Sequence, residues 1–160
     1  MKPLQNKRGE VPIASAIAIV LFAMVIAMAL YIAYVYAQTT AVRNAMNKGL
    51  SNLAVTISED TYAALRESDF EAYAEKLTGS SAYRRELEDK YRQDVLGAVE
   101  LDSDKYRIDN IRLDFEVNGK KITYTCTCDV VFYATVFGNT VPAAANSLSV
   151  SGAHTAKYGR

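Results

Sequence analysis

The chain contains one stretch of thirty-two residues, Val11 to Val42, without a single Asp, Glu, Lys, Arg or His. Its most apolar part runs from Ile13 to Ala37. As an α-helix that rises about 1.5 Å per residue, this part would be roughly 37 Å long, which is enough to cross a hydrocarbon core of about 30 Å with some tilt. A lone segment in lipid must satisfy its backbone N–H and C=O groups internally, so it must be helical. The sequence therefore predicts a transmembrane helix over residues 11–37.

The charges that flank this stretch are unevenly distributed. Lys2, Lys7 and Arg8 precede it, against a single acidic residue, Glu10. Basic residues are favoured on the cytoplasmic side of a membrane span. We therefore predict that residues 1–10 form a basic cytoplasmic leader and that the C-terminal domain lies outside the cytoplasm.

The rest of the chain offers little material for catalysis. Basic and acidic residues are nearly equal in number after the apolar stretch, so no basic patch indicates nucleic acid. The chain has one His, two Cys and no Trp, and it contains no dinucleotide-binding, P-loop or zinc-helix motif. We expect no enzyme activity, no cofactor, no metal and no nucleic-acid partner.

Three groups of residues could still carry chemistry. Cys126 and Cys128 share one face of a predicted strand, where two strand steps of roughly 6.6 Å disfavour a disulfide, so we expect reduced core thiols. His154 stands alone and is expected on a surface or an edge strand. The acidic residues Asp102, Asp104 and Asp109 are similar in pattern to the ligands of a calcium-binding loop. Basic residues lie between them, however, and the glycine that an EF-hand loop requires is missing.

The helix is expected to continue beyond the membrane. An apolar stripe at helical spacing follows the span and consists of Val42, Met46, Leu50, Leu53 and Ile57. We predict one helix from Pro12 to about Ile57, in which residues 38–57 form an extension. Thr56–Glu59 matches a capping box, which predicts a break near Ser58. Residues 58–160 would then form an extracytoplasmic head.

The head begins with two predicted helices. The first runs to Leu77 and is interrupted by a new cap at Ser68-Asp69, and the second starts near Ala82 after a Thr78–Ser81 turn. The apolar positions of that second helix are Tyr83, Leu87, Tyr91, Val95 and Ala98. Its charged residues are read as a solvated surface: Arg84, Arg85, Glu88, Asp89 and Arg92.

The apolar period changes to two after Arg107, which indicates strands. Asn118-Gly119 predicts a type I′ hairpin turn. The expected pairs are Val117–Lys120, Phe115–Ile122, Leu113–Tyr124 and Ile111–Cys126, with Glu116 opposite Lys121. The second strand should reach a turn at Phe137–Asn139, and Pro142 with Ala143–Asn146 should bend or break the return before a last strand from Leu148 to about Tyr158. The predicted fold class is α+β, with a long N-terminal transmembrane helix and a small head of helices packed on an antiparallel sheet.

Small residues recur at a spacing of four along the apolar segment. Ala29, Ala33 and Ala37 form one such row, and Ala23 and Ala27 repeat the pattern above it. Small residues with this spacing let a second helix approach closely in lipid. We call these five alanines the alanine face and predict that it packs against neighbouring helices.

The sequence Lys7-Arg8-Gly9-Glu10 directly before a long apolar helix resembles the leader of type IV pilin-like proteins. The nearest resemblance is to the TadE-like minor pilins, or pseudopilins, of tight-adherence (Tad) pilus systems. These proteins have an Arg-Gly pair, one N-terminal helix and a small extracytoplasmic domain. They commonly carry a Glu a few residues into the apolar run, where this chain has Ala14.

The resemblance implies cleavage between Gly9 and Glu10 by a prepilin peptidase. It also implies a structural role in a Tad-type pilus assembly or secretion apparatus, where other pilin-like subunits, a membrane assembly platform and an ATPase are the partners besides the lipid bilayer. Two other interpretations remain open. The chain could be a membrane-anchored extracytoplasmic binding or sensing domain, or a secreted domain after signal-peptide cleavage between Ala37 and Gln38.

Overall fold

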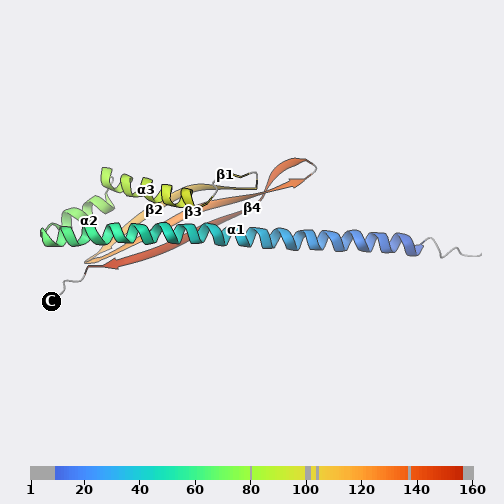
Figure 1. Ribbon diagram of the computed structural model, residues 1–160, viewed down its shortest axis with the longest axis horizontal. Helices are drawn as coiled ribbons and strands as arrows, with labels where there is room; N and C mark the ends of the chain where they lie inside the picture. The colour runs from blue at the N-terminus through green and yellow to red at the C-terminus, as the bar shows by residue number, and fades with distance from the viewer. Residues whose placement is uncertain (1–9, 80, 100–101, 104, 137, 157–160) are drawn as a thin grey trace, which may run out of the picture. The chain divides into compact units, whose positions relative to one another are not determined.

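The structure, a computed structural model, describes residues 10–79, 81–99, 102–103, 105–136 and 138–156. Figure 1 shows its elements: the helices α1 (Glu10–Arg66), α2 (Phe70–Thr78) and α3 (Ala82–Ala98), and the strands β1 (Asp102–Ser103), β2 (Tyr106–Asn118), β3 (Lys121–Val136) and β4 (Asn139–Thr155). The chain divides into two compact units, residues 1–38 and residues 39–160. The predicted α+β class, with a long apolar N-terminal helix followed by helices packed on an antiparallel sheet, is confirmed.

The predicted break near Ser58 is wrong, because α1 continues to Arg66. The buried stripe of this helix does not stop at Ile57: Thr61 is fully buried and Leu65 is also buried. Packing of these two positions against the head outweighs the local capping pattern. The helix ends where Ser68 adopts a positive φ of 62°, the left-handed conformation that commonly closes a helix. The interruption predicted at Ser68-Asp69 is confirmed, and α2 follows it.

Helix α3 begins as its sequence predicts. The Ser81 Oγ accepts a hydrogen bond of 3.0 Å from the backbone N–H of Arg84, which satisfies one of the free donors at the helix start. Leu87, Tyr91 and Val95 are buried, as expected. Ala98, the last residue of α3, is exposed instead of buried.

The sheet has the order β1-β2-β3-β4, and every neighbouring pair is antiparallel. The hairpin between β2 and β3 is present, but its loop is Gly119-Lys120, with Asn118 opposite Lys121. Within the hairpin loop only Gly119 has a positive φ, of 58°, and glycine at the first loop position is what a type II′ turn requires. The predicted register is therefore wrong by two residues, and Glu116 lies opposite Thr123.

Two irregularities shape the long strands. The β2–β3 register shifts between Asp109 and Arg112, where Asn110 has a positive φ of 53°. The β3–β4 register shifts next to Tyr133, which pairs with Pro142. Of the predicted bend or break at Pro142, the break is therefore wrong, and what the strand shows there is the register shift. Since β4 is an edge strand, a residue without an N–H is tolerated there. The last strand accordingly starts at Asn139 and ends at Thr155, and Tyr158 lies outside the described residues.

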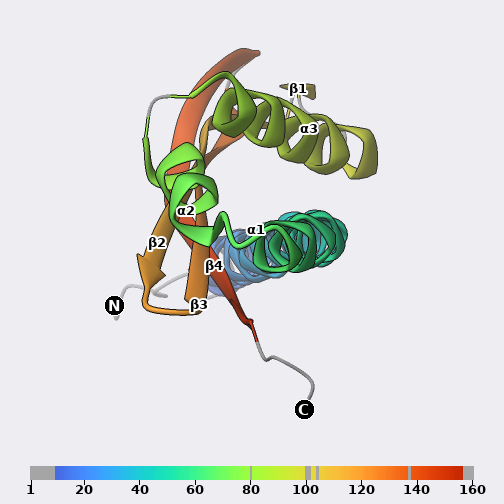
Figure 2. The same cartoon turned by 90° about the vertical axis from the view of Figure 1, so that its left-hand side faces the viewer.

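The helices of the head lie on one face of the sheet, as Figure 2 shows, and the buried residues of the head come from that face and from the helices. Alternate residues of the central strand β3 are buried: Ile122, Tyr124, Cys126, Cys128, Val130 and Phe132. From α1, the core receives Val42, Ala45, Met46, Leu50, Leu53 and Ile57. The hydroxyl of the buried Tyr91 donates a 3.1 Å hydrogen bond to the Met46 carbonyl, which ties α3 to α1.

Candidate functional site

The most unusual surface of the described chain is the apolar part of α1. This helix is the one described helix that is long and apolar enough to cross a membrane, and no residue of its most apolar 18-residue window is buried. From Ile13 to Ile32, twelve large apolar side chains are 45–69% exposed. Burying a side chain of this kind completely stabilises by about 1.5–3 kcal/mol. Because these twelve side chains are on average about three-fifths exposed, covering them would contribute about three-fifths of the total for complete burial, on the order of 10–20 kcal/mol.

Such a continuous apolar surface exceeds what a soluble protein leaves open to water. The backbone of this segment needs no partner, because every interior N–H and C=O group is bonded within the helix. Only its side chains lack a cover. Lipid or other apolar helices therefore fit the segment chemically, and the segment is a candidate membrane span or signal sequence.

The alanine face lies on this segment. Ala23, Ala27, Ala29, Ala33 and Ala37 are all helical and exposed. At about 100° per residue, Ala29, Ala33 and Ala37 form one row, and Ala23 and Ala27 lie on the adjacent side of the helix. Glu10 is the first residue of α1, whereas Gly9, the other half of the predicted processing site, lies outside the described residues.

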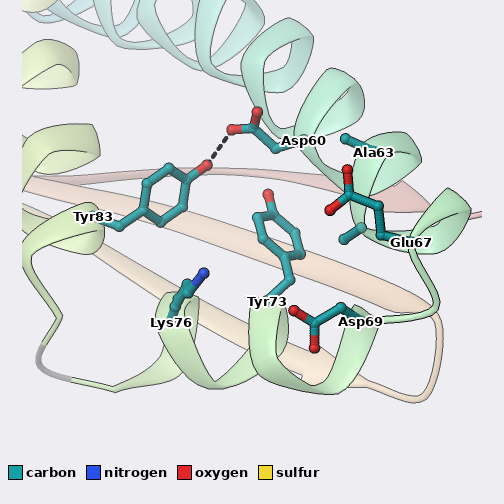
Figure 3. Close-up of a pocket in the computed structure, with 8 residues that line it drawn as sticks. Asp60, Ala63, Glu67, Asp69, Tyr73, Lys76 and Tyr83 are labelled. Atoms are coloured by element: carbon teal, nitrogen blue, oxygen red, sulfur yellow. Dashed lines mark hydrogen bonds between the residues drawn. The ribbon is translucent and has the colours of Figure 1, made fainter.

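The head contains a shallow pocket of about 230 Å³ near the end of α1, shown in Figure 3. Asp60 and Tyr83 form a hydrogen bond beside it, with the phenol donating to the carboxylate. Burial, followed by the hydrogen bonds to Asp60 and Tyr73, raises the pKa of Tyr83. The remaining lining residues are Ala63, Ala64, Glu67, Asp69, Tyr73 and Lys76.

The residues around this pocket mainly join helices of the head to one another and do not provide an activated group for catalysis. The Asp60–Tyr83 hydrogen bond joins α1 to α3, and the Tyr73 and Tyr83 rings pack with their centroids 6.0 Å apart. A phenol whose pKa is raised is a poor base and a poor nucleophile. Sequence reasoning missed this cluster, because its members come from three helices and follow no local motif.

The thiols behave as buried core groups. Cys126 and Cys128 are both free and both almost completely buried. The Cys128 Sγ lies 3.4 Å from the Met46 Sδ. Burial raises the pKa of Cys126 to about 11 and that of Cys128 to about 12. The expectation of reduced core thiols agrees with this geometry.

The other candidate residues are not brought together into a site. His154 lies on the edge strand, as expected, and its ring meets that of Tyr62 edge-on at 6.0 Å between centroids. Asp109 forms a 2.7 Å ion pair with Arg107, while Asp104 lies outside the described residues. Within the described part of the chain, no group of three or more His, Cys, Asp or Glu residues is placed to hold a metal ion.

Comparisons with protein families, with curated proteins and with solved structures found no match for this chain. What can be said of its function therefore rests on the exposed apolar segment of α1 and on the head that follows it.

Proposed function

We propose that this protein is a single-pass, pilin-like structural subunit, a TadE-like component of a Tad-type pilus assembly or secretion apparatus. One observation carries the proposal. A single uninterrupted helix has an uncovered apolar first half, and its second half supplies the core of an α+β head. This layout suits a subunit that is first held in a bilayer and later exchanges lipid for neighbouring helices.

The two halves of α1 have different roles in this proposal. Val42, Met46 and Leu50 are anchored in the core of the head, so the head fixes one end of the helix. The alanine face offers small side chains at the spacing that close helix contacts require. In this mechanism the chain itself supplies no energy, and a separate ATPase and a membrane platform would drive assembly.

The first test is the intact mass of the mature protein, isolated from cells that produce it. Loss of residues 1–9 is the expected result and supports processing between Gly9 and Glu10. A full-length mass favours a permanently anchored binding or sensing domain. A protein free in the medium that begins at Gln38 contradicts the proposal and favours a secreted domain.

The second test separates packing from insertion. Replacing Ala29, Ala33 and Ala37 together with Leu should leave membrane insertion intact, because Leu is more apolar than Ala, yet abolish recovery of the protein in assemblies sheared from the cell surface. The matched control replaces Met24, Met28 and Val35 with Leu, which changes the opposite side of the same helix. If both triple variants assemble as the unaltered protein does, the alanine face has no role in packing.

A further inference from the structure

The sulfur-bearing side chains of the head lie together in its core. Residues 39–160 contain three of them, Met46, Cys126 and Cys128, which we call the sulfur cluster. Met46 lies on α1, and the two cysteines lie on β3. All three are at most 1% exposed, and the Cys128 Sγ lies 3.4 Å from the Met46 Sδ. Packing alone does not require sulfur at these positions, because other apolar side chains of similar volume fill a core as well.

Cys126 belongs to the same cluster. It precedes Cys128 by two residues on one strand, so the two side chains leave the same face of the sheet. The Tyr91 hydroxyl, which donates to the Met46 carbonyl at 3.1 Å, also lies within hydrogen-bonding reach of the Cys126 thiol. The sulfur cluster therefore lies where α1, α3 and β3 meet.

The fold adds a third soft ligand that the sequence does not place beside the thiols. Met46 stands 82 residues before Cys128, and the packing of α1 on the sheet brings the two sulfur atoms into contact. Thiolate and thioether sulfur are soft ligands, and together they favour Cu(I) among the metal ions common in proteins. The sulfur cluster is thus a set of three soft donors inside one core.

The spacing of the cysteines suits an ion better than a disulfide. Two strand steps separate their Cα atoms by roughly 6.6 Å, and a disulfide would have to bring the sulfurs to about 2.05 Å. Metal–sulfur bonds of about 2.3 Å hold two ligands at a trigonal angle about 4.0 Å apart. The Cys128 and Met46 sulfurs would have to separate by about 0.6 Å to bind one ion, and the flexible methionine side chain can make this adjustment.

We propose that Cys126, Cys128 and Met46 bind one Cu(I) ion in the core of the head. Each thiol loses its S–H proton to solvent and forms a copper–sulfur bond, and the Met46 Sδ donates a lone pair. No electron is transferred. The bound group carries one net negative charge, which the Tyr91 hydroxyl can stabilise by donating to the Cys126 thiolate.

The same residues suit Zn²⁺ less well. A structural zinc site has four ligands drawn from cysteine, histidine and carboxylate side chains. Within the described ranges of the chain, no His, Asp or Glu joins the two cysteines as a third ligand of this kind. Bound Cu(I), in contrast, would use the thioether and would link α1 to β3 through metal–sulfur bonds.

The binding test uses the reduced full-length chain in detergent micelles, without oxygen, and Cu(I) supplied as its bicinchoninate complex. Because the sulfur cluster is buried, the ion is offered both to the folded chain and during refolding from urea. One Cu(I) per chain is expected from the loss of colour of the complex, with three sulfur neighbours in X-ray absorption at the copper edge. Bound Cu(I) should also raise the melting temperature of the head.

Variants test the ligands separately. Met46→Leu removes the thioether with little change in volume, so it should leave two sulfur neighbours and weaken binding at least about tenfold. Met28→Leu makes the same change in the apolar segment of α1 and is the matched control. Cys126→Ala/Cys128→Ala should bind no Cu(I). Thermal unfolding of the metal-free variants checks that each folds, and if the double variant does not fold, Met46→Leu decides.

Three results would overturn the proposal: no bound Cu(I) after either treatment, equal binding by Met46→Leu and Met28→Leu, or undiminished binding by a folded Cys126→Ala/Cys128→Ala variant. The outcome is separate from that of the pilin-like subunit, because all three ligands lie in the head. A mature protein that begins at Gln38 would refute the anchored subunit and would still contain the whole sulfur cluster.

Discussion

Gly152 in β4 lies opposite Tyr124 in β3. Because of this pair, we expect Gly152→Ala to lower the stability of the head, although intrinsic propensity favours alanine over glycine in a strand. A Cβ at residue 152 would lie 2.3 Å from Tyr124 Cε2 and 2.8 Å from its Cζ. Ordinary carbon contacts are about 3.5–4.0 Å, so the ring would have to retreat by more than about 1 Å. Tyr124 is only 4% exposed, and the packed core offers little room for that movement.

Overpacking of this kind costs about 1–3 kcal/mol, and the small separation places Gly152→Ala toward the upper end, at about 2–3 kcal/mol. For a head of this size we expect the melting temperature to fall by about 8–12 °C. Backbone entropy alone would favour Ala over Gly in a strand by roughly 0.5–1 kcal/mol, so the direction of the change separates the two effects. Thermal unfolding of the full chain in micelles, followed by the near-ultraviolet circular dichroism of tyrosine, measures it, since the chain has no Trp.

Gly97 in α3 provides the matched control, because a Cβ there would meet no atom within 4 Å. Gly97→Ala should stabilise by about 0.5–1 kcal/mol through helix propensity. Combining Gly152→Ala with Tyr124→Val should remove most of the cost of the alanine, since the ring that it strikes is gone. A neutral or stabilising Gly152→Ala, or the same cost with Val at residue 124, would refute the packing argument.

Three further predictions concern the head. Tyr91→Phe should lower stability by about 1 kcal/mol, because it deletes a buried hydrogen bond between α3 and α1, and an unchanged melting temperature would contradict this. Cys126 and Cys128 should resist a thiol reagent at pH 8 until urea unfolds the chain, because burial raises their pKa to about 11 and about 12; rapid labelling of the folded protein would argue against their burial. Two side-chain hydrogen bonds lower the pKa of Asp129 below its ordinary 3.8. The ionised carboxylate therefore adds to the stability of the fold above that value, and this stabilisation is lost as the pH falls further. Asp129→Asn should therefore flatten the acid limb of the stability curve below about pH 4, which melts at stepped pH would show.

Long periodic features were predictable from the sequence, because they depend on one physical pattern at a time. The apolar stripe of α1, the burial of Leu87, Tyr91 and Val95 on α3, and the change to alternating strands all follow from side-chain period. The hairpin was located correctly for the same reason. Its inward residues were also correct, since a register error of two leaves every side chain on its own face.

Features that depend on contacts between distant segments were not predictable. The local signal at Thr56–Glu59 favours the start of a new helix. Thr61 and Leu65 are nevertheless buried in the head, and α1 continues without a break to Arg66. Pro142 indicates a strand break only if the strand is internal, and the sequence does not show that β4 lies at an edge. The Asp60–Tyr83 hydrogen bond depends on how α1 and α3 pack.

The chain has two long stretches without Asp, Glu, Lys or Arg, Val11–Val42 and Val130–Ala156. Strand β4 lies in the second stretch, and the two stretches leave different groups to be covered. In the first, the helix satisfies the backbone, and large apolar side chains remain uncovered. In the second, the exposed side chains are mostly small and polar, and β4 is an edge strand with β3 as its one neighbour in the described sheet. Lipid or an apolar helix can cover the first stretch but cannot supply hydrogen bonds to the second. A partner strand can supply those bonds but cannot cover a cylinder of apolar side chains. Charge alone would place the two stretches in one class, but the groups that they leave uncovered differ: large apolar side chains in the first stretch, and the edge of a sheet in the second.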